Sequence, residues 1–127
     1  MLTNIDPVSF LATLDAGVAK AFYEEKLGLT LIADEHFALV FNLNGHVLRI
    51  AKVGELAPAA HTVFGWHVNN IEESVKGLVA RGIVFEMYEG MEQDELGIWD
   101  SPSGARVAWF KDPDGNNLSL TEVPGSE

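Results

Sequence analysis

Apolar and polar residues alternate along several short stretches of the chain, and two longer stretches follow a helical period instead. Residues 8–15 alternate as a strand does, and residues 16–28 carry their apolar positions on one helical face. Asp15 is suited to cap the start of that helix, and Gly28 to end it. Three alternating or apolar stretches follow, which predict strands at residues 29–35, 37–43 and 46–53.

The second half of the chain repeats this order of elements. Residues 63–70 predict a strand and residues 71–82 a helix that Gly82 ends. Asn70 is suited to cap this helix, and Glu73 follows three residues later, which is the spacing of a capping box. Strands are expected at residues 83–89, 105–111 and 116–123, and residues 96–100 form a further stretch able to pair.

Two segments seventy residues apart align with each other. The segment NGHVLRIAKV at 44–53 lies over DGNNLSLTEV at 114–123, glycine on glycine and apolar on apolar. Val8 and Val63 each stand seven residues before the cap of the following helix. The chain therefore reads as two copies of a βαβββ module, each too small to bury a good core alone.

The expected architecture is an α+β fold of one domain, residues 1–127, built from these two modules. The first module covers about 6–53, a linker covers 54–62, and the second module covers about 63–124. Since each module has one helix, that helix covers one face of its sheet. The helices then lie on the outer face, and the free sheet faces curve around a shared cleft, where ligands prefer to bind.

Composition and charge narrow the class of protein. The 127 residues include no cysteine, which excludes disulfides, a thiol nucleophile and thiolate metal sites. Neither a signal peptide nor an apolar run of about 20 residues is found, so a soluble, cytoplasmic protein is expected. The net charge is −11, which argues against nucleic acid or an anionic membrane as a partner. Acids concentrate within 86–95, either as a solubilising loop or as a rim that attracts a cationic ligand.

Three segments carry a resemblance to a known family. They are AFYEEKLGL at 21–29, LVARGIVFE at 78–86 and, above all, AWFKDPDGNNLSL at 108–120. With these motifs in this order, the chain from Val8 to Val123 resembles the glyoxalase / bleomycin-resistance / extradiol-dioxygenase superfamily, also called the vicinal oxygen chelate fold. The resemblance implies paired βαβββ modules whose sheets form a half-barrel cleft, and it implies a homodimer.

Enzymes of that family hold a divalent metal through residues on the first and last strands of each module. The four equivalent positions in this chain are occupied by Val8, Arg49, Val63 and Ser119. The first three do not bind a metal in their usual state, and a lone serine is a poor ligand. The histidines offer no substitute, because even His61 and His67, which share strand parity, are six residues and so about 20 Å apart. We therefore expect no metal and no cofactor.

Strand parity places a mixed set of side chains on the face that would bind a ligand. Arg49 is either a solvent-exposed or dimer-interface residue, or a guanidinium that binds a carboxylate or another anion, with Glu86 as one possible protein partner. His67 is either hydrogen-bonded within the sheet or a general base or donor. The remaining candidates are Phe10 and two groups of side chains. Asn117 and Ser119 offer polar groups, and Tyr88, Trp99 and Trp109 offer aromatic walls.

Three functions are compatible with these residues. The first is a metal-free, homodimeric protein that binds a small organic molecule, as bleomycin-resistance proteins do. The second is a lyase, isomerase or dioxygenase of the same superfamily that uses His67 or a metal chelated by the substrate. The third, a scaffold without a ligand, is disfavoured because it leaves the mixed sheet face without a purpose. Metal analysis and a panel of small molecules distinguish the three.

Overall fold

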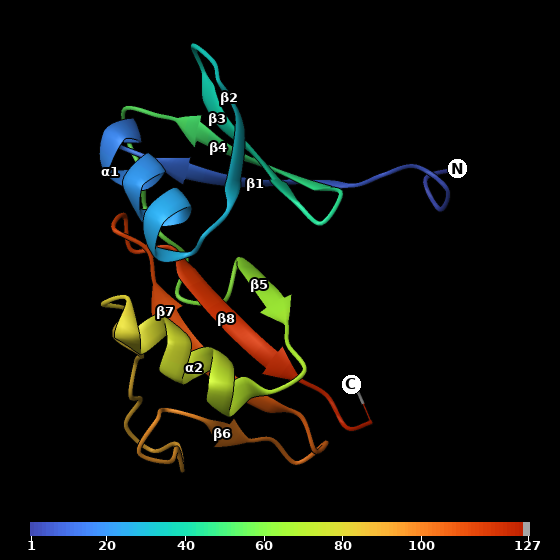
Figure 1. Ribbon diagram of the computed structural model, residues 1–127, viewed down its shortest axis with the longest axis vertical. Helices are drawn as coiled ribbons and strands as arrows, with labels where there is room; N and C mark the ends of the chain where they lie inside the picture. The colour runs from blue at the N-terminus through green and yellow to red at the C-terminus, as the bar shows by residue number, and fades with distance from the viewer. Residues whose placement is uncertain (126–127) are drawn as a thin grey trace. The chain divides into compact units, whose positions relative to one another are not determined.

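Two four-stranded mixed sheets, one in each half of the chain, carry the structure, a computed structural model that describes residues 1–125. The chain divides into a first unit, Met1–Ala57, and a second unit that begins at Pro58. Within each unit a helix lies against one face of the sheet (Figure 1). No helix among residues 1–125 is long and apolar enough to span a membrane.

The order of elements is the same in both units. The first unit contains β1 (Val8–Thr13), α1 (Ala16–Ala21), η1 (Phe22–Lys26), β2 (Thr30–Asp34), β3 (Ala38–Leu43) and β4 (His46–Lys52). The second contains β5 (Phe64–His67), α2 (Ile71–Ala80), β6 (Trp99–Asp100), β7 (Arg106–Lys111) and β8 (Asn117–Glu122). The sheet orders are β1-β4-β3-β2 and β5-β8-β7-β6, with the first and last strands of each unit parallel. The predicted α+β class and the pair of βαβββ modules are confirmed.

In the first unit, alternate residues of the strands form the core. Leu11, Leu48 and Ile50 are buried, as the alternation of the sequence predicts. They face the helical segment, where Ala19 and Tyr23 are fully buried. Burial of this apolar face is the main contribution to the stability of the unit.

The first helix begins as predicted and ends with an unpredicted wide turn. Val18 N donates to the side chain of Asp15, which confirms the N-cap. After Ala21 the helix widens into the π-helical turn η1, in which Leu27 N donates to Phe22 O at 3.1 Å. Gly28, with φ of 72°, ends the helix in the left-handed conformation that glycine adopts without strain. No residue pattern in this segment signals the wide turn.

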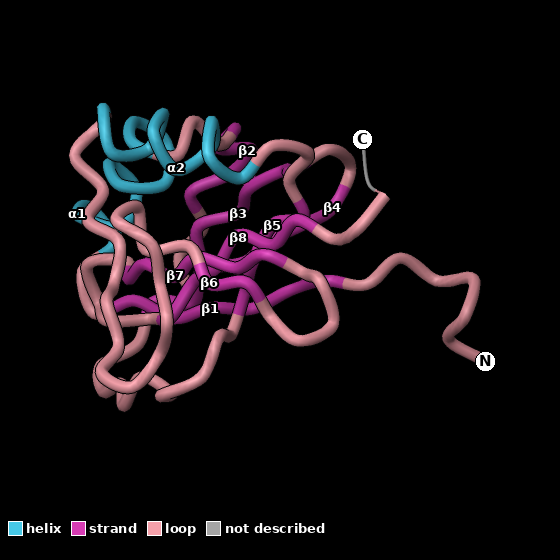
Figure 2. Tube along the Cα trace, turned by 90° about the horizontal axis from the view of Figure 1, so that it is seen from below, coloured by secondary structure: helices cyan, strands magenta, loops and turns pink. Residues whose placement is uncertain are grey.

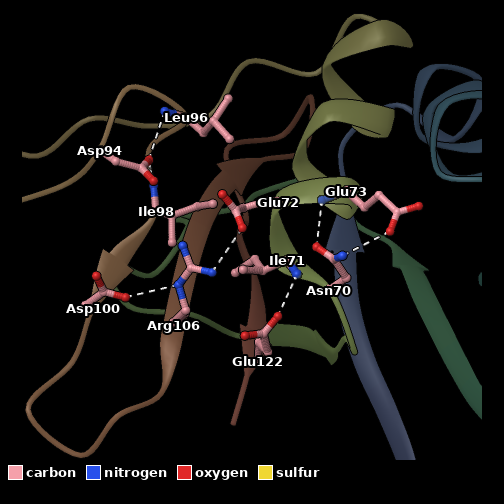
Figure 3. A network of polar contacts seen from close by, with 10 residues as sticks. All are labelled: Asn70, Ile71, Glu72, Glu73, Asp94, Leu96, Ile98, Asp100, Arg106 and Glu122. Carbon is pink, nitrogen blue, oxygen red and sulfur yellow. Dashed lines mark hydrogen bonds and ion pairs between the residues drawn. The ribbon is translucent and has the colours of Figure 1, made fainter. Parts of the chain in front are cut away.

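The second unit buries the apolar stripe of α2 against its own sheet. Ile71 and Val75 of α2 are fully buried, as are Phe110 and Leu118 of the sheet. Glu73 N donates to Asn70 Oδ1 at 3.1 Å, which confirms the predicted cap. The Asn70 amide in turn donates to Glu73 Oε2, and Ile71 N donates to the Glu122 carboxylate from β8 (Figure 3). The start of α2 is therefore held both locally and by the sheet.

The prediction of a strand at residues 83–89 is wrong for most of these residues. Only Phe85 forms a bridge there, opposite Phe110, and the strand that pairs with the other half of β7 is β6 at Trp99–Asp100. Between them runs a long irregular segment, drawn as loop in Figure 2. The Gln93 amide donates to Glu86 O and Gly97 O and accepts from Tyr88 N, so it occupies backbone groups that a strand would pair. The predicted pairing of residues 96–100 is confirmed.

Candidate functional site

The register of the strands places equivalent residues on the sheet face opposite the helix in each unit. In the first unit, Arg49 of β4 lies between Phe10 of β1 and Val40 of β3. In the second unit, the corresponding row is Gly65 of β5, Ser119 of β8 and Trp109 of β7. Arg49 and Ser119 are thus equivalent by register as well as by sequence. The two rows differ in size, charge and chemistry.

Arg49 forms an ion pair within its own unit. Its Nη2 donates to Glu35 Oε1 at 2.8 Å, and both side chains are partly exposed. The guanidinium does find a protein carboxylate, but the partner is Glu35 at the β2–β3 turn rather than Glu86. Glu86 lies 3.9 Å from Lys111 in the second unit. An added anion would therefore have to compete with a resident carboxylate for Arg49.

A second ion pair lies beside the first. Lys52 Nζ donates to Asp34 Oδ1 at 2.6 Å and to the carbonyl oxygen of Glu35. The hydrogen bond from Lys52 lowers the pKa of the Asp34 carboxyl below its ordinary value. Asp34 at the end of β2 and Glu35 in the turn that follows thus pair with the two bases of β4, and the charges of these four side chains cancel.

The family's metal site does not fit the residues at the equivalent positions. Val8 and Val63 are aliphatic and hold no donor atom. Arg49 carries a positive charge and is bonded to Glu35, so it would repel a cation. Within residues 1–125, no group of three or more histidine, aspartate or glutamate side chains could hold a metal ion. The expected absence of a metal stays a prediction, and no chemical step is derived through one.

Three aromatic rings of the second unit form one cluster. The ring of Trp109 lies 5.6 Å from that of Tyr88, edge to face, and 6.0 Å from that of Trp99. Burial raises the pKa of the Tyr88 phenol, and the nearby charge of Glu86 raises it further. All three rings are only partly buried. The predicted aromatic residues therefore come together and offer a surface on which a flat molecule can stack.

Two polar side chains on β8 lie next to this cluster. Ser119 is the register partner of Trp109, and its hydroxyl lies over Gly65, where a methyl group would be 2.8 Å from it. Asn117, two residues earlier on the same face, is 5% exposed. Its Nδ2 donates to Ala59 O at 2.6 Å, whereas its Oδ1 is buried and has no hydrogen-bond partner within the described part of the chain. Ser119 is thus a direct neighbour of Trp109, and Asn117 lies two residues before Ser119, opposite Lys111.

The remaining two candidates lie at exposed positions. Phe10 is 65% exposed beside Arg49 on the first sheet. His67 is exposed at the end of β5, opposite Thr121, on the same face as Ser119. Neither the sequence pattern nor strand parity revealed Glu35, Gln93 or the Lys111–Glu86 pair. The signal available for Glu35 was the pair of acids at 34–35, placed to meet the two bases of β4.

The acidic segment 86–95 is in part a structural element. Asp94 Oδ1 accepts hydrogen bonds from Leu96 N and Ile98 N, each at 2.9 Å (Figure 3). Together with the Gln93 amide, this carboxylate orders the loop that leads into β6. Tyr88 and Trp99, which contribute to the aromatic cluster, flank this loop, so the loop positions part of the candidate site.

Comparison with known proteins defines the class from the fold. A glyoxalase family protein from Enterococcus faecalis aligns with a TM-score of 0.71 and 26% identity over 96% of this chain and all of that one. A lactoylglutathione lyase from Agrobacterium tumefaciens aligns with a TM-score of 0.71 and 18% identity, covering 94% of this chain and 93% of that chain. The lyase is so distant that it shows the fold alone. A search of curated proteins gave no match.

The family model settles the family. The model of the Glyoxalase/Bleomycin resistance protein/Dioxygenase superfamily matches residues 4–120. The chain belongs to this superfamily, and the predicted resemblance is confirmed.

Proposed function

We propose that this protein binds a small organic molecule without a metal ion, using the sheet face that carries the aromatic cluster and the polar residues of β8. Membership of the superfamily supports binding of a small molecule in general, and the residues of the face support this particular form of it. The cleft that the sequence predicts stays a prediction, as does the cytoplasmic location.

The single observation that carries the proposal is the chemistry at the four ligand positions. Two valines, an ion-paired arginine and a serine replace the donors that a metal enzyme of this family needs. The same faces retain a partly exposed aromatic cluster and a few polar groups, which is the usual make-up of a binding site for an organic ligand. Binding requires no catalytic group, whereas the enzyme alternative requires one that these positions do not provide.

The proposal is tested in two measurements on the purified full-length chain. Elemental analysis is expected to find well under one equivalent of divalent metal per chain. Thermal-shift screening of a small-molecule panel is then expected to yield a ligand, since saturation at one hundred times Kd stabilises a protein by about 2.7 kcal/mol. Trp109→Leu should reduce the shift, and Val18→Ala, a change at an exposed position of α1 in the first unit, should leave it unchanged.

Two results would contradict the proposal. One equivalent of tightly bound metal, whose removal abolishes ligand binding, would show that the function depends on a metal. Turnover of a panel compound by the metal-free protein would favour the lyase, isomerase or dioxygenase alternative, and His67→Ala would then identify or exclude His67 as the base.

We also propose that the protein is a homodimer. Support comes from the unpaired outer edges of the sheets and from apolar side chains exposed on the first unit, among them Val8, Phe10 and Ile32. Proteins tend to cover such edges and surfaces, and symmetric pairing is the common way to do so. Sedimentation velocity at micromolar concentration should give the mass of a dimer, and a monomer at high micromolar concentration would contradict it.

A further inference from the structure

The side-chain amide of Asn117 is fixed in one orientation and leaves one acceptor unused. Its Nδ2 donates to the carbonyl oxygen of Ala59 at 2.6 Å. A carbonyl oxygen only accepts, so the nitrogen must be the atom that faces Ala59, and the amide cannot be turned over. Oδ1 therefore points away from Ala59, is buried, and has no donor among residues 1–125.

A buried acceptor without a donor costs free energy, and most such groups in native proteins have a partner. A molecule that brings an N–H or O–H group to Oδ1 recovers this cost when it binds. A molecule of the same shape without a donor does not, and one that brings a carboxylate would place oxygen lone pairs against those of Oδ1. The atom therefore selects among ligands by their hydrogen-bonding groups.

The aromatic cluster lies within reach of the same ligand. Alternate residues of one strand are about 7 Å apart, so Asn117 is this far from Ser119, which is the register partner of Trp109. That span matches a flat molecule of one or two fused rings with a donor at its edge. Its ring would stack on Trp109 and its donor would reach Asn117.

The charges on this face favour a ligand without negative charge. Lys111 is the register partner of Asn117, and Glu86 lies 3.9 Å from its ammonium group. The base opposite Asn117 is therefore already paired with an acid, in a chain whose net charge is −11. A carboxylate would gain little here, whereas an amide or amine would meet only the acceptor.

Access to Oδ1 depends on residues 58–63, the start of the second unit. Ala59, which holds the amide, belongs to residues 58–63, a stretch without helix or strand. An irregular connection can shift to admit a donor group more easily than a paired strand can.

We propose that the sheet face of the second unit binds a flat aromatic molecule that donates an N–H group to Asn117 Oδ1 while its ring stacks on Trp109. This inference rests on the proposed function, since it names the class of ligand for the same face. It also replaces the carboxylate-bearing ligand that Arg49 alone suggested.

The test is calorimetric titration of the unmodified full-length chain with three probes that share one ring system. These are 2-naphthamide, which carries an N–H donor, methyl 2-naphthoate, which lacks one, and 2-naphthoate, which is an anion. The amide is expected to bind at least tenfold more tightly than the ester. Asn117→Val, which installs the valine found at the equivalent Val47, should lower the affinity for the amide to that for the ester.

Matched variants assign the effect to this face. Asn42→Val, the same substitution on the first sheet, should leave the affinities for all three probes unchanged. Trp109→Leu should weaken the amide and the ester alike, because both stack on the ring. If Asn117→Val does not fold, the ratio of amide to ester affinity on the unmodified protein still decides.

The outcomes separate this inference from the broader function. Equal affinities of the unmodified protein for amide and ester, or tighter binding of 2-naphthoate, overturn the donor-selective site while binding of small molecules stands. Binding of the amide that persists in Asn117→Val also overturns it. If neither these probes nor any member of the wider panel binds, the proposed function fails together with the inference.

Discussion

The two units share one topology and differ at the row of residues that crosses the middle of each sheet face. The first unit has Phe10, Arg49 and Val40 in that row, and the second has Gly65, Ser119 and Trp109. A large exposed ring and a charged side chain fill the first row. Two small residues and one indole make up the second.

The same backbone geometry therefore supports two different surfaces. In the first unit the charges of Arg49 and Lys52 are opposed by Glu35 and Asp34, and the apolar residues Val8 and Phe10 remain exposed. In the second, the strands approach closely at Gly65, and the aromatic cluster lies beside Ser119 and Asn117. The proposals of a dimer formed by the first unit and of a flat ligand on the second rest on this difference.

The largest difference should appear when Gly65 gains a side chain. Its methyl group in Gly65→Ala would lie 2.7 Å from the Ser119 carbonyl oxygen, which is backbone and cannot turn aside. We expect a loss of about 1–3 kcal/mol in the free energy of unfolding, measured by urea denaturation. At the equivalent position, Phe10→Ala should change stability by less than about 0.5 kcal/mol in the monomer. Equal stability of Gly65→Ala and the parent would show that the close approach of the strands is not tight.

Removal of the helix caps should lower the free energy of unfolding by less than Gly65→Ala does. The two losses should rank the helices by how much each depends on its cap. Asp15→Ala and Asn70→Ala each remove a side chain that accepts from the first turn, so each should lose about 1 kcal/mol. Asn70→Ala should lose more, because the Asn70 amide also bonds Glu73. Asp15→Asn and Asn70→Asp serve as controls that keep the accepting oxygen. Urea denaturation gives all four values, and an unchanged midpoint for Asn70→Ala would contradict the role of this cap.

A smaller effect is expected from the two partly exposed arginines. Arg106 bonds Asp100 at 3.0 Å and lies 3.4 Å from Glu72, joining β7 to β6 and α2 (Figure 3). Within residues 1–125, the Arg49 side chain bonds Glu35 alone. Arg106→Gln should lose up to about 1 kcal/mol and Arg49→Gln less, since exposed ion pairs contribute little. High salt should reduce the difference in the free energy of unfolding between the two variants. A larger loss in Arg49→Gln would reverse this ranking of the units.

The smallest effect concerns the ionisation of Tyr88. Its pKa is raised by burial and then by the charge of Glu86, so the neutral phenol is favoured in the folded chain. This contribution to stability is complete below the pKa of the unfolded chain, about 10, and is lost as pH rises through the higher folded value. Phenolate absorbance of the protein minus that of Tyr88→Phe should follow a titration above pH 10. A Tyr88 titration at or below that value would show that the ring is more exposed than the structure indicates.

Much of the fold followed from local pattern. Alternation located nine stretches of strand or possible strand, and Asp15, Gly28, Asn70 and Gly82 marked the ends of both helices. These features depend on backbone preferences and on which residues avoid water, and a short segment of sequence is enough to indicate both. The wide turn at Phe22–Lys26 was missed because its side chains are compatible with an ordinary helix.

The strand predicted at 83–89 failed for a different reason. Its residues have the apolar pattern of a strand, but the Gln93 side chain takes backbone partners on both sides of the loop. A side chain several residues away decides the matter, and no local pattern reports it. Trp99 and Asp100 pair with β7 instead, within a stretch that the sequence indicated only as able to pair.

The sequence alone determined the topology, the equivalence of Arg49 with Ser119 and the set of residues on each sheet face, because repetition and parity constrain these without knowledge of distances. The tertiary structure alone decided which of those residues interact. It paired Arg49 with Glu35, brought Tyr88 and Trp99 against Trp109, and fixed the Asn117 amide with one acceptor unused. Hydrogen bonds and ion pairs act over about 3–4 Å, so they depend on where side chains from distant segments end, which the order of residues does not specify.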